Sequence, residues 1–200
     1  MKGGWVAVLL DDGVFAGAQL LREVETDFNE LGRVDVIAVD IPIGFGPRAA
    51  DAAARALLNG ATSTVFTTPT RESLERPFGP GLGVSAQAHA LGRRILHVTG
   101  LASREPRLRE VHPEVSFRAM GGGAPLPRKK SAAGALVRVE LLRRNGIELG
   151  ELGSAATAPL DDVLDAAAAA WTATRIQRGN ARSLPDSPDT VDGLRVAIWY

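Results

Sequence analysis

The segment that decides the fold is Val36-Ile37-Ala38-Val39-Asp40-Ile41-Pro42-Ile43-Gly44. Its near-continuous β-branched run, which starts at Val34 and ends at Ile41, predicts a strand buried on both faces. Pro42 and Gly44 then end the strand. Such strands alternate with covering helices in α/β proteins. Asp40 stands at the C-terminal end of this strand, which is where open α/β sheets place their ligand crevice.

Asp40 has two interpretations that the residues leave equally open. A buried carboxylate needs a partner, because burying an unpaired charge is costly. A divalent cation is one such partner. The alternative is structural: Asp40 caps the turn before Pro42 or pairs with a nearby arginine.

A second segment, Arg109-Glu110-Val111-His112-Pro113-Glu114-Val115-Ser116-Phe117, combines acids and a histidine with apolar residues. We expect a strand over Leu108–Val115, on which Glu110, His112 and Glu114 share one face, although the proline distorts the spacing. Glu114 is a candidate metal ligand. His112 either orients a water, contacts a phosphate or forms a core hydrogen bond, and lone histidines are more often structural. Glu110 is expected to be merely exposed.

The remaining pattern predicts a mixed α/β domain, in the order hairpin, strand, helix, long insertion, strand, helix, helix, short strand. We expect one domain over residues 1–200 with a loop and helix insertion around 61–106. The polar stretch Ser183–Asp189, with two prolines, is expected to be a loop. The other expected elements are a hairpin of Trp5–Leu10 and Val14–Leu20 around Asp11-Asp12-Gly13, a helical turn from Thr26 to Leu31, helices over Arg48–Leu58, Val84–His97, Ala132–Arg144 and Pro159–Gln177, a loop over Ala61–Gly83, and a last strand over Leu194–Trp199.

Three acids, Asp161, Asp162 and Asp165, lie in the first turns of the last helix. Acids at a helix N-terminus interact favourably with the macrodipole, and this accounts for one or two of them without any function. Asp162 and Asp165 share one side of the helix. The alanine run 166–170 lets this helix approach a sheet closely, so the acids could join a cluster at the strand ends.

Candidate phosphate contacts are Lys129, Lys130 and Arg71. The two lysines follow a Gly/Pro loop and precede a helix, and helix N–H groups with ammonium groups suit phosphate. The alternative, slightly favoured for the lysines, is a solvated basic turn. The chain has no Walker loop, nucleophile elbow or dinucleotide fingerprint.

Bulk composition limits the chemistry. The 23 basic and 23 acidic residues give a formal net charge of +0, so nucleic acid would need a local basic face. With no cysteine and 3 histidines, thiolate and histidine-rich zinc sites are disfavoured, and oxygen-bound Mg²⁺ or Mn²⁺ fits better. There is no signal peptide pattern and no membrane-length apolar run, so we expect a cytoplasmic, bacterial protein that does not bind membranes.

Several segments together resemble the bacterial and archaeal domain of unknown function 429 family, which is described as predicted nucleases with a ribonuclease H-like fold. They cover nearly the whole chain in the same order. The Asp-Ile-Pro-Ile-Gly and His-Pro-Glu segments are the most specific. The matching pieces are Gly3–Val8, Val39–Gly44, Val65–Arg71, Glu110–Phe117, Lys129-Lys130 with Gly134, and Asp161–Ala166.

The resemblance implies a ribonuclease H-like mixed sheet with flanking helices. It also implies a metal-binding set of Asp40, Glu114 and the helix acids Asp162 and Asp165, with His112 beside them. The sequence departs from the family pattern at its start. Family members look as if they begin with a strand that ends in an aspartate, whereas here Met1-Lys2 precede Gly3 directly. Either the start site has been placed too late, or the protein has lost an essential ligand and with it its activity. Loss of the strand would expose sheet edges and favour association into homo-oligomers.

Two hypotheses follow. The first is a Mg²⁺- or Mn²⁺-dependent nuclease, in which metal activates water and stabilises the leaving oxygen while Lys129, Lys130 and Arg71 hold phosphates. It could be inactive in this form. The second is a non-catalytic ribonuclease H-like module that binds a nucleotide, an acidic ligand or a protein, and the neutral charge and missing acid favour it. No nucleotide-binding signature supports a third kind of hydrolase or phosphotransferase.

Overall fold

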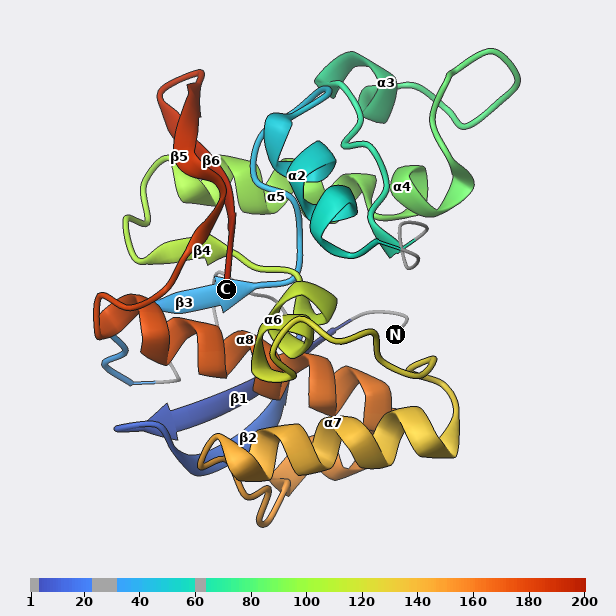
Figure 1. Cartoon of the computed structure of the whole chain (residues 1–200). Helices are drawn as coiled ribbons and strands as arrows, with labels where there is room; N and C mark the ends of the chain where they lie inside the picture. Colours follow the sequence, from blue (N-terminus) through green and yellow to red (C-terminus); the bar gives the residue numbers. More distant parts are fainter. Residues whose placement is uncertain (1–3, 23–31, 60–63) are drawn as a thin grey trace.

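The computed structural model describes residues 4–22, 32–59 and 64–200, and over these ranges the chain is a mixed α/β protein. Its strands pair into three small two-stranded sheets within the described ranges. Figure 1 shows the first hairpin below α8 (Leu160–Gln177), against which β1 packs, with α7 (Ala132–Arg144) in front of them and the second sheet across the middle. The expected helix turn at Thr26–Leu31 falls outside the described residues.

The N-terminal hairpin is confirmed. Strand β1 (Trp5–Asp11) pairs antiparallel with β2 (Val14–Leu21). Between them Asp12 and Gly13 have φ values of 48° and 85°, the left-handed conformation that a two-residue hairpin turn of this kind requires. The Asp-Gly pair between two apolar runs therefore predicted the turn correctly.

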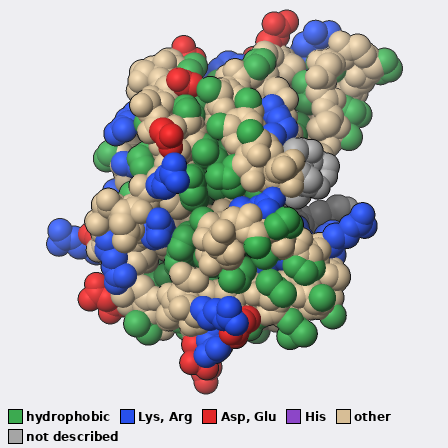
Figure 2. Space-filling model, viewed as in Figure 1, with side chains coloured by type: hydrophobic (Ala, Val, Ile, Leu, Met, Phe, Trp, Pro, Cys, Tyr) green, Lys and Arg blue, Asp and Glu red, His purple; other side chains and the backbone are tan. Residues whose placement is uncertain are grey.

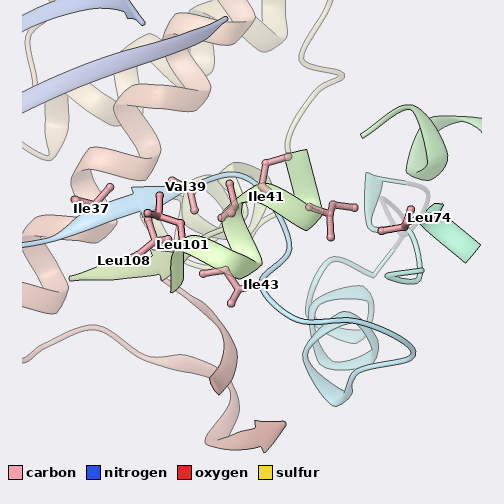
Figure 3. Close-up of a cluster of buried hydrophobic side chains, with 9 residues drawn as sticks. Ile37, Val39, Ile41, Ile43, Leu74, Leu101 and Leu108 are labelled. Atoms are coloured by element: carbon pink, nitrogen blue, oxygen red, sulfur yellow. The ribbon is translucent and has the colours of Figure 1, made fainter. Parts of the chain in front are cut away.

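The central sheet is shorter than the β-branched run suggested. Strand β3 (Ile37–Val39) pairs in parallel with β4 (Leu108–Glu110). A parallel bridge from Val111 to Trp199 brings β6 (Leu194–Trp199) alongside β4. Apolar side chains of β3 and the segment after it pack on α5 (Gly92–Ala102), and Figure 3 shows this cluster.

The structure corrects the expected strand over Leu108–Val115. Strand β4 ends at Glu110, and α6 (Pro113–Met120) begins at the proline. His112 is still extended, with φ −130° and ψ 111°, and proline suits the first helical position because its fixed φ and missing N–H cost nothing there. Glu110, His112 and Glu114 therefore share no strand face. Glu110 is also buried, with 4% of its surface exposed, rather than merely exposed.

The predicted helices over Arg48–Leu58, Ala132–Arg144 and Pro159–Gln177 are found as α2 (Ala49–Leu57), α7 and α8. The expected helix over Val84–His97 is divided into α4 (Ala86–Ala90) and α5. The expected loop over Ala61–Gly83 contains α3 (Arg71–Glu75), whose cap residue Thr70 accepts a hydrogen bond from Ser73 N. A 3₁₀ helix, η2 (Gly153–Thr157), precedes α8.

The expected loop at Ser183–Asp189 is also wrong, because β5 (Ser183–Val191) pairs antiparallel with β6 there. The pairing register is irregular between Leu184 and Asp189. Pro185 and Pro188 lie within this irregular part. Proline has no N–H for a ladder, so a strand tolerates it where pairing is interrupted.

Helix α8 connects several parts of the fold, because it contacts β1, β3, α6 and α7. Ala167 and Ala168 are fully buried, and such small side chains allow close approach to the cluster around Phe117, Leu142 and Leu164. No helix in the described ranges is long and apolar enough to cross a membrane.

Candidate functional site

Two cavities meet at Asp40 and Asp165, which line both of them. The first, of about 370 Å³, lies between β1, β3 and α8, and we call it the strand slot. The second, of about 340 Å³, we call the acid cavity. Its polar and charged lining is contributed by Asp40, Arg48, Asp51, Thr64, Gln87, Glu110, His112, Glu114, Lys129 and Asp165.

Four parts of the chain position the predicted site residues around the acid cavity. Asp40 directly follows β3, and His112 is the cap residue before α6. Glu114 lies in the first turn of α6, Lys129 in the loop before α7, and Asp165 in α8. The structure thus brings together side chains from residue 40 to residue 165, as the cluster hypothesis required.

Asp40 is accessible to solvent, and its side chain lines both cavities. The protein atoms packed around its carboxylate still remove part of its hydration, and this desolvation raises the pKa of Asp40 to about 6. The positive charges of His112 and Lys129 oppose this rise, and the carboxylate of Asp165 adds to it. Asp40 therefore changes its charge close to neutral pH, which is unusual for an aspartate.

Asp165 has one engaged and one unengaged oxygen. Its Oδ2 accepts a hydrogen bond from Lys129 Nζ at 2.7 Å. Its Oδ1 is buried and has no hydrogen-bond partner among the described residues. Burial raises the pKa of Asp165, while Lys129 opposes that rise. Burial lowers the pKa of Lys129, but the charge and hydrogen bond of Asp165 and the charges of Asp40 and Asp161 together outweigh it, so the net shift is upward.

Glu114 is held differently. Both of its carboxylate oxygens accept hydrogen bonds from Nη2 of Arg138, at 2.8 and 2.7 Å. Nη1 of the same guanidinium donates to the carbonyls of Pro127 and Gly134, at 3.0 Å each. Arg138 is 2% exposed and its guanidinium lies 5.3 Å from the ring centre of Phe117. Glu114 therefore joins α6 to α7 and to the loop that carries Lys129.

The acid at the end of the neighbouring strand, Glu110, is fully paired. It accepts hydrogen bonds from Arg48 at 2.5 and 2.8 Å and from Ile43 N at 2.7 Å. Arg48 also pairs with Asp51, whose other oxygen accepts a hydrogen bond from Thr68 N at 2.9 Å. We call Arg48, Asp51 and Glu110 the arginine cluster.

His112 lies at the edge of the acid cavity. Its Nε2 is 3.3 Å from the carbonyl oxygen of Thr64. Its Nδ1 is buried, and within the described ranges it has no hydrogen-bond partner. His112 Nδ1 and Asp165 Oδ1 are thus two buried polar atoms of cavity-lining residues that have no hydrogen-bond partner in the described ranges.

The other predicted residues lie away from the acid cavity. Asp162 lines only the strand slot. Lys130 is exposed and lines neither cavity. Arg71 is exposed on α3, 3.9 Å from Glu75 and over the ring of Phe45.

Sequence reasoning missed the arginines. Arg138 had a readable signal: it lies in a helix with Gly134, Leu141 and Leu142, at spacings that bury one face. Gly134 itself leaves no room for a side chain, because an added Cβ would lie 2.0 Å from the carbonyl oxygen of Arg128. Arg48 had no comparable signal, since its partner Glu110 is 62 residues away.

A hard divalent cation fits part of this arrangement. Asp40 and the unengaged Oδ1 of Asp165 offer oxygen ligands of the kind that Mg²⁺ and Mn²⁺ prefer. Glu114 does not fit as it stands, because Arg138 occupies both of its oxygens. Across the described ranges, no group of three or more His, Asp or Glu side chains is arranged to hold a metal.

Comparisons with known proteins give one result. A family model described as "Protein of unknown function (DUF429)" matches residues 1–190. No curated protein and no solved structure matches the chain. The matched range contains every polar and charged residue that lines the acid cavity. Since the model covers nearly the whole sequence, the chain belongs to the DUF429 family.

Proposed function

We propose that this chain is a divalent-metal-dependent nuclease that hydrolyses phosphodiester bonds of nucleic acid in the acid cavity. The observation that carries the proposal is the pair Asp40 and Asp165: the pKa of the first is raised to about 6, and the second has a buried, unengaged oxygen. Carboxyl groups with shifted pKa values are concentrated in the cavities of functional sites, and here the shift coincides with an oxygen that no group of the described residues engages.

The residues divide into three roles. Asp40 and Asp165 would hold Mg²⁺ or Mn²⁺, and such an ion stabilises the charge that develops on a phosphodiester under attack by water. Lys129, which already faces Asp165, would hold a phosphate oxygen. His112 lies beside Asp40, with Nδ1 unengaged, and is placed to exchange a proton with a group in the cavity.

Glu114 receives a positioning role in this proposal. Its double contact with Arg138 fixes the loop that carries Lys129. The ribonuclease H-like fold is also part of the proposal. The hairpin β1–β2 on one side of the strand slot, and β3, β4 and β6 on the other, would form one mixed sheet if a strand filled the slot.

The test is metal binding and cleavage by matched variants. Asp40→Asn and Asp165→Asn should each weaken Mn²⁺ binding, measured by isothermal titration calorimetry, by at least about tenfold, because each removes a charged ligand. Asp189→Asn, an exposed acid on β5, is the control and should bind as the unaltered protein does. Asp40→Asn and Asp165→Asn should likewise weaken cleavage of single-stranded RNA, single-stranded DNA and RNA–DNA hybrids. Asp189→Asn should leave that cleavage unchanged. Equal Mn²⁺ affinity in all four proteins would contradict the proposal.

A second candidate is the non-catalytic module, and one observation favours it. Figure 2 shows Lys and Arg side chains scattered among acidic ones on this face, without a continuous basic surface for a nucleic acid backbone. This candidate predicts that the protein binds a nucleotide or a protein without cleaving any phosphodiester at millimolar Mn²⁺. Metal binding without turnover on the three substrates would support it over the nuclease.

A further inference from the structure

The strand slot has the geometry of a gap between two sheet edges. Every residue from Gly4 to Asp12 and from Arg33 to Asp40 lines it. Side chains alternate along a strand, so a cavity against a sheet face is lined by every second residue. Lining by consecutive residues means that the slot lies along the edges of β1 and β3.

The backbone of β1 turns hydrogen-bonding groups toward the slot. Leu20, opposite Val6 in the hairpin, donates its N–H to Ser154 Oγ at 2.9 Å, away from β1. The pair Val6 and Leu20 is therefore one of the non-hydrogen-bonded pairs of the ladder. It follows that the N–H and C=O of Val6, and by alternation those of Val8, point to the other side, into the slot.

The same holds for β3 across the gap. Ile37 N donates to Arg107 O at 3.0 Å, and Val39 O accepts from Val111 N at 2.9 Å, both on the side of β4. The intervening residue, Ala38, therefore turns its N–H and C=O toward the slot. In the described ranges β1 pairs only with β2, and β3 only with β4. Two unpaired edges thus face each other.

Direction and depth also suit an added strand. Figure 1 shows that β1 and β3 point in opposite directions, so a strand parallel to β3 would be antiparallel to β1. The floor of the slot is a face of α8 made of small side chains, with Ala166, Ala169, Ala170 and Ala173 along it. This floor leaves room for larger side chains on the occupant.

Charge defines the occupant further. Six aspartates and two arginines line the slot, and Asp40 and Asp165 lie at the end where β3 ends. Apolar side chains on the face of an occupant that points to α8 would pack on its alanines. A cationic side chain at the C-terminal end of an occupant parallel to β3 would meet the two aspartates.

We propose that the strand slot binds an extended segment of another polypeptide by strand addition between β1 and β3. The segment has about five β-branched or other apolar residues, the length of strand that the two edges can pair. A lysine or arginine follows at the end near Asp40 and Asp165. The proposal goes beyond the nuclease function, since it requires neither a metal nor nucleic acid.

The probe is a fluorescently labelled, amidated hexapeptide with the sequence valine, threonine, valine, isoleucine, valine, lysine. Binding is measured by fluorescence anisotropy in EDTA, so that the result is independent of any metal site. A matched peptide with proline in place of the central valine cannot complete the ladder and should bind at least about tenfold more weakly. Replacing the terminal lysine by glutamate should also weaken binding. Equal binding of the proline peptide would overturn the proposal.

Variants of the chain test the location. Ala170→Phe fills the floor of the slot and should weaken peptide binding at least about tenfold, whereas Ala133→Phe, on the exposed side of α7, should not. Hydrogen exchange on the unaltered protein gives a second readout that survives if Ala170→Phe fails to fold. Bound peptide should slow exchange at the amides of Val6, Val8 and Ala38. Unchanged exchange at these amides would contradict strand addition.

The competing occupant is a second copy of the chain. Multi-angle light scattering without peptide should show a monomer. A dimer in which the amides of Val6, Val8 and Ala38 are already protected would overturn the proposal, because the chain itself would then fill the slot.

Discussion

Two neighbouring parallel strands each place an acid at the same edge of the central sheet, and the two acids differ in their hydrogen-bond partners. Glu110 ends β4 and has its oxygens engaged by Arg48 and by the backbone of Ile43. Asp40 follows β3 and faces the two cavities, with its pKa raised to about 6. The arginine cluster is saturated with partners, whereas the group around Asp40 and Asp165 is not.

The difference teaches how to separate structural from functional carboxylates. A buried acid that is fully hydrogen-bonded by a fixed guanidinium holds distant segments together, and losing one partner is costly. A buried acid with an unengaged oxygen contributes little to stability and is available to a ligand. The pair Glu114 and Arg138 lies between these extremes, because Glu114 is partly exposed at the cavity.

The largest expected effect comes from breaking the arginine cluster. Arg48→Met leaves Glu110 and Asp51 buried without their shared partner, so we expect the free energy of unfolding to fall by about 3–5 kcal/mol. Urea denaturation followed by circular dichroism at pH 7 measures it. Arg143→Met removes an exposed partner of Glu140 and should change stability little. A loss for Arg48→Met as small as that of the control would show that the cluster is not structural.

Arg138→Met tests the intermediate case. It removes both hydrogen bonds to Glu114 and two to backbone carbonyls, but water reaches Glu114 through the cavity. We expect a loss of about 1.5–3 kcal/mol, smaller than for Arg48→Met, in the same urea experiment. If the two variants lose equal stability, Glu114 belongs with the saturated acids and not between the two groups.

Local signals in the sequence predicted much of the fold. The Asp12-Gly13 turn, the helix capped by Ser131 and the alanine-rich α8 were found where their residues indicated. The errors at Pro113 and at β5 have one physical cause. Proline ends one element without saying whether a helix follows, as at α6, or a strand continues past an irregularity, as at β5.

The residues that gather at the acid cavity were predictable in part from the sequence, whereas their pairing was not. Acids at strand ends and on the face of α8 were expected to gather, and Asp40, Glu114 and Asp165 line one cavity. Which acid receives an arginine depends on contacts across 24 residues for Glu114 and 62 for Glu110. No local pattern encodes such distances, so Glu110 looked like the least important acid of its segment.

Lys129→Met tests whether Asp165 depends on its single partner. Without the ammonium group, burial is no longer opposed, so the pKa of Asp165 should rise further. Carboxyl-carbon NMR titration measures that rise, with Lys130→Met, an exposed neighbour, as the control. Because Lys129 is itself partly exposed, the accompanying loss of stability should stay below about 1 kcal/mol. An unchanged pKa would mean that Lys129 does not hold Asp165.

Asp40→Asn should change the free energy of unfolding least of these variants, and the direction of the change follows from the pKa of Asp40. The pKa of Asp40 is about 6 in the folded protein against 3.8 for a free side chain, so folding favours the protonated form. The stability that Asp40 contributes is therefore fully present below about pH 4 and is lost as the pH rises through 6. The uncharged variant avoids this loss.

In EDTA, Asp40→Asn should match the unaltered protein near pH 4 and melt at a higher temperature at pH 7. The gain should stay below about 1 kcal/mol, since water in the cavities screens the charge. Glu110→Gln, the matched change on the neighbouring strand, should lower the melting temperature instead, because it weakens the contact with Arg48. If Asp40→Asn also lowers it at pH 7, Asp40 is held by a partner as Glu110 is, and the contrast between the two strand ends disappears.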